Sequence, residues 1–81
     1  MNKVHKVVIK YGNYYMIIQT EGEEDFWVWQ IQKEEFNRWS KSDMAVPSTE
    51  NLELFANDPY NDTIGTSWSS FKTIGDAEKS I

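Results

Sequence analysis

The residues of this chain that are best suited to chemistry are carboxylates. Four of them fall within five positions, as Glu21, Glu23, Glu24 and Asp25 around Gly22. A glycine in such a run predicts a turn, so we expect these side chains at the tip of a hairpin. Carboxylates on a rigid scaffold can occupy the places of phosphates in a basic groove, and their field speeds the encounter with a basic protein. The alternative is a solvated acidic turn that keeps a tryptophan-rich chain soluble.

Charge is distributed unevenly along the sequence. Residues 1–19 carry three lysines and no acid, whereas residues 20–81 carry thirteen acids and five bases. Acids beyond the hairpin run include Glu50, Glu53, Asp58 and Asp62. The net charge of −5 repels phosphate backbones and anionic membranes. We therefore expect no direct nucleic-acid binding and no membrane binding. The expected partner is a basic protein, such as a nuclease or another nucleic-acid-binding protein.

The sequence lacks the residue sets that common enzyme mechanisms need. His5 is the single histidine and there is no cysteine. No Gly-x-Ser-x-Gly elbow, phosphate-binding loop or dinucleotide fingerprint occurs. One histidine is too few for zinc, and the oxygen-rich stretch 57–62 lacks the spacing of a calcium loop. We predict no enzymatic activity, no catalytic residue, no cofactor and no metal; a carboxylate-only active site is the enzymatic alternative.

Aromatic side chains form the second group with a binding role to consider. Tyr14, Tyr15, Trp27 and Trp29 fall on adjacent predicted strands. Such rings can stack on single-stranded bases, but those platforms also need a positive groove. Core packing is the competing explanation for all four. We predict a partner-binding site that combines these aromatics with the four hairpin carboxylates.

These side chains must be positioned by a sheet. The stretch Phe26–Ile31 is apolar on both faces when read as a strand, because successive side chains point to opposite sides. One face would carry Trp27, Trp29 and Ile31, and the other Phe26 and Val28. A strand of this kind needs cover on both sides, which predicts a central position in the sheet.

Two further strands precede it. Val4–Tyr11 and Tyr14–Thr20 are joined by Gly12-Asn13, which predicts a two-residue type II′ turn with positive φ at the glycine. Strict alternation divides the first strand into two faces: His5, Val7, Ile9 and Tyr11 on one, and Val4, Lys6, Val8 and Lys10 on the other. Residues 3–31 therefore predict a three-stranded antiparallel meander.

The remainder of the chain predicts short helices. Lys33–Ser42 changes to a helical period and should lay Phe36 and Trp39 on the meander. Residues 48–50 could cap a helical turn over 52–56, with a strand as the alternative, and 57–62 is dense in turn formers. A strand through Trp68–Phe71 precedes a terminal helix that Thr73 caps.

We therefore expect an α+β fold in a single domain over residues 1–81. It would contain a small antiparallel sheet of three to four strands, one helix packed on the sheet and a short C-terminal helix. With no cysteine and no apolar leader within Met1–Lys10, the expected location is the cytoplasm, as a monomer or homodimer.

In size, charge and composition the chain resembles the small acidic proteins with which phages and mobile elements block host defence or host nucleic-acid machinery, anti-CRISPR proteins among them. The resemblance implies a non-enzymatic inhibitor that acts by occlusion, with nucleic-acid mimicry as its chemistry, in the host cytoplasm. Two alternatives remain: an immunity or antitoxin protein that neutralises a cognate toxin, and an oligomeric structural or assembly protein.

Overall fold

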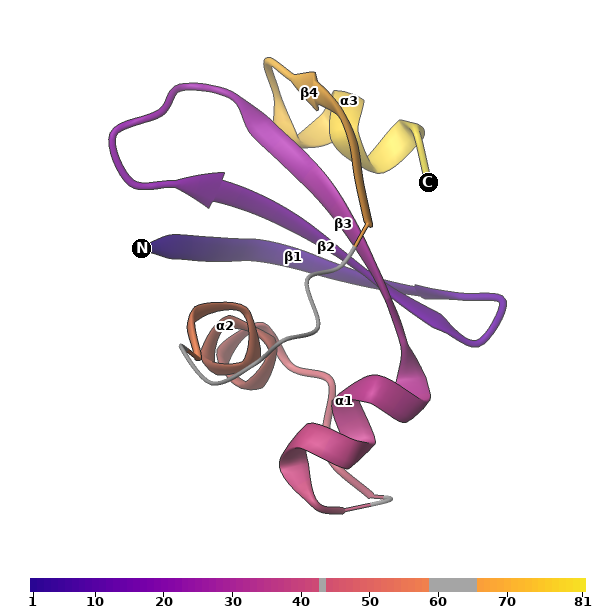
Figure 1. The fold of residues 1–81 in the computed structure, drawn as a ribbon. Coiled ribbons are helices and arrows are strands. Elements are labelled where there is room, and N and C mark those ends of the chain that lie inside the picture. The colour runs from indigo at the N-terminus through magenta and orange to yellow at the C-terminus, as the bar shows by residue number, and fades with distance from the viewer. Residues whose placement is uncertain (43, 59–65) are drawn as a thin grey trace.

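A computed structural model of the chain describes residues 1–42, 44–58 and 66–81, with the backbone alone for residues 66–68. One antiparallel sheet has the strand order β1-β2-β3-β4 (Figure 1). Its strands are β1 (Asn2–Lys10), β2 (Asn13–Thr20), β3 (Phe26–Gln32) and β4 (Thr66–Phe71). The helices are α1 (Lys33–Ser40), α2 (Thr49–Asn57) and α3 (Ile74–Lys79). The α+β prediction is confirmed, and β4 extends the predicted meander to four strands.

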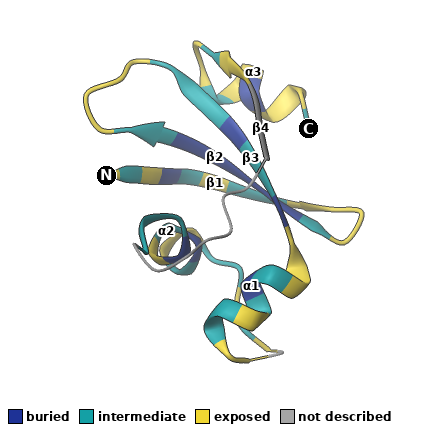
Figure 2. Cartoon of the chain, viewed as in Figure 1, coloured by how far each residue is buried: buried dark blue, intermediate teal, exposed yellow. Residues whose placement is uncertain are grey.

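Helices cover both faces of the sheet. Helices α1 and α2 lie on one face and α3 lies on the other (Figure 1). On the first face, Phe36, Leu52 and Phe55 are buried with Met16 and Ile18. On the second face, Ala77 is buried with Tyr15, Ile17 and Val28. Strand β3 is an inner strand, as predicted, but β2 is the more deeply buried, with an unbroken run of buried residues over 14–18 (Figure 2).

A β-bulge changes the predicted faces of β1. Val4 lies opposite Ile18 but Lys6 lies opposite Ile17, so His5 is an extra residue in the strand. A bulge shifts the alternation by one. Val4 therefore joins Val7 on the face of α1 and α2, and the prediction that it shares a face with Lys6 is wrong.

The turn between β1 and β2 lies one residue earlier than predicted. Lys10 pairs with Asn13, which leaves Tyr11 and Gly12 as the loop. Both have positive φ, 54° and 75°. Positive φ at both central residues is the type I′ pattern, whose twist matches that of paired strands. The predicted type II′ turn at Gly12-Asn13 is therefore corrected.

The helix boundaries largely follow the capping residues. Ser48 caps α2 by accepting a hydrogen bond from the Asn51 backbone N–H at 3.1 Å, and Thr73 caps α3 in the same way with Asp76 at 3.0 Å. The helical alternative for residues 48–56 is thus the correct one. Helix α1 ends at Ser40 because Lys41 turns to φ 59°. The predicted loop over 57–62 lies mostly outside the described residues.

Candidate partner-binding face

The acidic run lies at the tip of the β2–β3 hairpin, as predicted. Gly22 takes φ 88°, and the Glu23 backbone N–H donates to the Thr20 carbonyl at 3.0 Å. The Gln19 amide donates to the carbonyl oxygens of Glu23 and Glu24 at 3.1 and 3.3 Å. These bonds hold the backbone of the tip, while the side chains of Glu21, Glu23 and Glu24 are exposed.

Asp25 differs from the other three acids of the run. Its carboxylate accepts a hydrogen bond from Lys72 Nζ at 2.6 Å. This bond and the lysine charge, together with a hydrogen bond from Ser70, hold the pKa of Asp25 below its ordinary value. Asp25 is therefore tightly paired within the chain, so its charge is partly neutralised there.

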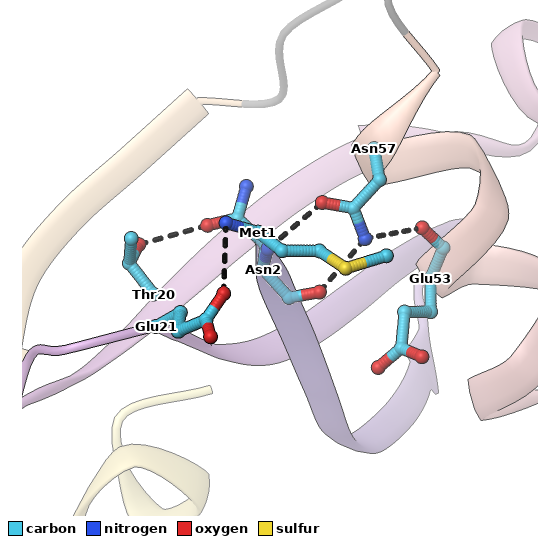
Figure 3. Close-up of polar contacts among 6 residues, drawn as sticks. All are labelled: Met1, Asn2, Thr20, Glu21, Glu53 and Asn57. Carbon is cyan, nitrogen blue, oxygen red and sulfur yellow. Dashed lines mark hydrogen bonds and ion pairs between the residues drawn. The ribbon is translucent and has the colours of Figure 1, made fainter.

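The N-terminus connects the hairpin tip to α2 (Figure 3). The Met1 α-amino group lies 3.8 Å from the Glu21 carboxylate, and the Met1 carbonyl accepts from the Glu21 backbone N–H at 2.8 Å. Next along β1, the Asn57 side chain accepts from the Asn2 N–H at 2.8 Å and donates to the Asn2 carbonyl at 2.7 Å. The hairpin tip and α2 thus lie on either side of the N-terminal residues and are both bonded to them.

Two open hollows adjoin at this junction. The first, of about 480 Å³, is lined by Met1, Asn2, Lys3, Gln19, Thr20, Glu21, Gly22, Glu23 and Glu53. The second, of about 640 Å³, is lined by Met1, Trp39, Glu50, Glu53, Leu54, Asn57 and Asp58. Both include Met1 and Glu53, so they form one continuous surface.

We call this surface the acidic face, and its carboxylates are Glu21, Glu23, Glu50, Glu53 and Asp58. Against these five carboxylates, the lining residues that the structure describes contribute two cationic groups, Lys3 and the Met1 α-amino group. Negative potential adds up where carboxylates outnumber cations around a concave surface. The arrangement can therefore attract and hold a cationic group.

The predicted aromatics occupy different places. Tyr14 and Tyr15 are only 4% and 9% exposed, on opposite faces of β2, so their side chains belong to the core. Trp29 is half-buried against the core under α1 and α2. Trp27 alone of the four shares a surface with the acidic run: it lines a small hollow of about 380 Å³ with Glu23, Glu24, Asp25 and Lys72.

Helix α2 contributes residues to the acidic face that were not predicted as site residues. Glu50, Glu53 and Leu54 project from one side of α2 together with Asn57, at spacing i, i+3, i+4 and i+7. That stripe is visible in the sequence once a helix is assumed there. Its proximity to the hairpin tip is not visible, because it depends on contacts across the fold.

No protein-family model, curated protein or solved structure matches the chain. Within the described ranges, no three or more histidine, cysteine or acidic side chains are grouped so as to hold a metal ion. None of the helices among those residues has the length and apolar character to cross a membrane.

Proposed function

We propose that this chain is a non-enzymatic binding protein that inhibits a basic, nucleic-acid-handling protein by occupying its nucleic-acid groove. The observation that carries the proposal is the acidic face, where five carboxylates surround two adjoining hollows. A surface of this kind repels nucleic acid and attracts the proteins that bind it. The proposed function is that of the small acidic inhibitors that phages and mobile elements direct against host defence.

The rigidity of the face supports the same proposal. The hairpin tip is held by backbone hydrogen bonds, and the Glu53 carboxylate is held by the Val4 backbone N–H at 2.8 Å. Charges that are already in place lose little conformational entropy on binding. The Glu53 carboxylate and the backbone that carries Glu21 and Glu23 are therefore in place before a partner binds, and the carboxylates of the face can substitute for phosphates at lower cost.

The test is binding to a panel of purified basic nucleases and nucleic-acid-binding proteins, measured by calorimetry at rising salt and in competition with duplex DNA. We expect at least one target to bind, with affinity that falls as salt rises and with DNA excluded. The double variant Glu23→Lys/Glu50→Lys should lose at least tenfold in affinity for that target.

The matched control is Glu34→Lys/Asp76→Lys, which changes the net charge equally. Both control residues are exposed acids in the first turns of α1 and α3, away from the acidic face. We expect the control to lose much less affinity. Equal losses in the two double variants, or binding that leaves DNA in place, would contradict occlusion by this face.

A further inference from the structure

The second hollow of the acidic face, which we call the helix groove, combines apolar and acidic walls. Met1 and Leu54 are 82% and 65% exposed, and both line this hollow, so their apolar surface is accessible to a ligand there. Trp39 provides a third apolar surface beside them. The apolar walls of the groove are therefore accessible to a side chain of a partner.

Trp39 is held firmly in place. Its ring stacks on Phe36 with centroids 5.9 Å apart and meets Phe55 edge-on at 5.4 Å. Its indole N–H donates to the Asp58 carboxylate at 2.5 Å. A side chain fixed on three sides pays little entropy when a ligand packs on its remaining surface. Trp39 thus has the properties of a pre-organised binding anchor.

The rim of the helix groove is acidic. Glu50, Glu53 and Asp58 contribute carboxylates, and the Met1 α-amino group is the single cationic group among the described residues that line it. That amino group is paired at 3.8 Å with the carboxylate of Glu21, a residue that does not line the groove. A ligand that complements these walls must offer an apolar stem and a cationic head.

We infer that the helix groove receives an arginine side chain of the partner protein. The guanidinium is planar, stacks on indole rings and pairs with carboxylates through two parallel hydrogen bonds, whereas lysine offers a point charge. Tryptophan and arginine are also the residues that most often dominate protein interfaces. The inference rests on the proposed function and names the anchor through which the partner is recognised.

The test uses three blocked tripeptides, Leu-Arg-Leu, Leu-Lys-Leu and Leu-citrulline-Leu, titrated into the whole protein and followed by NMR. The reporter is the indole N–H signal of Trp39, identified by its absence in Trp39→Phe. We expect the arginine peptide to shift this signal, with affinity at least threefold above the lysine peptide and tenfold above the citrulline peptide. An unmoved signal, or equal affinity for the three peptides, would overturn the inference.

Variants locate the site and separate the two proposals. Leu54→Ala and Glu50→Gln should each weaken the arginine peptide about threefold or more, whereas Glu34→Gln on α1 should not. Leu54 and Glu50 are exposed, so these changes leave the core intact. Glu23→Lys lies outside the groove and should weaken a basic target protein without affecting the peptide. If the peptide fails to bind while the target still depends on Glu23 and Glu50, the arginine anchor is wrong and the proposed function stands.

Discussion

At the scale of single residues, Asn57 shows how one side chain can close a sheet edge. Strand β1 is an edge strand, and the outer backbone groups of Asn2 would otherwise be unpaired. The Asn57 amide accepts from one of them and donates to the other, and it also donates to the Glu53 carbonyl at 2.9 Å. An exposed edge invites pairing with other chains, so this contact protects the strand and fixes α2 beside it.

Replacing this amide should destabilise the protein. We expect Asn57→Ala to lower the free energy of unfolding by roughly 1–3 kcal/mol, because it leaves part-buried backbone groups without partners. Urea denaturation measures the change. The control is Asn51→Ala, which removes an amide bonded to the Val46 carbonyl at 2.9 Å in an exposed setting, and it should cost less. A similar midpoint for both variants would argue against the edge role of Asn57.

The pairing of Asp25 with Lys72 predicts a pH dependence. Because the folded state lowers the pKa of Asp25, the carboxylate stabilises the fold above its ordinary pKa, and this contribution is lost as the pH falls below about 4. Asp25→Asn should therefore be less stable than the parent protein at neutral pH, and the gap should close in acid. Melting temperatures of Asp25→Asn and the parent protein, measured from neutral to acid pH, test this dependence. Glu24→Gln, which removes a carboxylate without a salt-bridge partner among the described residues, is the comparison. A gap that persists unchanged at low pH would contradict the assignment.

At the scale of elements, the β1–β2 turn illustrates how hairpin geometry overrides residue preference. Tyr11 takes φ 54° although it has a bulky side chain, because the register leaves Tyr11 and Gly12 as the two central residues of a type I′ turn, and that turn requires positive φ at both. The cost is borne at an exposed site, where the ring lies 5.3 Å from Lys10 Nζ. The backbone strain at Tyr11 thus follows from the pairing of Lys10 with Asn13.

This turn offers a stabilising substitution. Tyr11→Asn should raise the free energy of unfolding by about 0.5 kcal/mol, since asparagine before glycine is the preferred type I′ pair. Gly12→Ala should lower it by roughly 1–2 kcal/mol through backbone strain alone, because an added Cβ meets no atom within 4 Å. Denaturant midpoints of the two variants must move in opposite directions if the turn is type I′.

Helix α2 provides a second test at this scale. Leu52 is fully buried and Leu54 is 65% exposed, an arrangement that a helix produces and a strand does not. Leu52→Ala should cost roughly 2–5 kcal/mol of stability, whereas Leu54→Ala should change it by less than about 0.5 kcal/mol. Chemical denaturation compares the two directly. Equal costs would favour the strand interpretation of residues 52–55.

At the scale of the whole molecule, cations and anions are used differently on the two sides of the sheet. Cations on β1 are used within the fold: Lys6 pairs with Glu78 at 2.7 Å, and Lys10 donates to the Ile81 carbonyl at 3.1 Å. Both contacts attach β1 to the C-terminal segment on the other side of the sheet from α1 and α2. The acidic face keeps a surplus of negative charge, which raises its self-repulsion.

A surface with surplus negative charge should lower the stability of the fold through like-charge repulsion. The variant Glu23→Gln/Glu24→Gln removes one carboxylate of the acidic face and its neighbour at the hairpin tip. We expect it to raise the free energy of unfolding by a few tenths of a kcal/mol at low salt, and this gain should disappear at high salt. Glu78→Gln, which removes the partner of Lys6, should not stabilise the protein. Salt-dependent melts of the three proteins would decide. A loss of stability in the double variant would contradict the idea that repulsion between carboxylates destabilises this part of the fold.

Much of the architecture follows from the sequence alone. Alternation over Phe26–Ile31, the capping residues Ser48 and Thr73, and the glycine within the acidic run each depend on neighbours a few positions apart. Such local patterns determine which segments become strands, helices and turns. They also place the four hairpin carboxylates at the tip, where Glu21, Glu23 and Glu24 are exposed and Asp25 is partly so.

Only the tertiary structure decided which of these residues meet. The bulge at His5 and the burial of Tyr14 and Tyr15 arise from how strands pair and what covers them, which local spacing does not encode. The bond between Glu53 and the Val4 N–H joins residues 49 positions apart and helps to hold α2 beside β1. The acidic face exists because distant segments pack together, and packing is set by the whole chain at once.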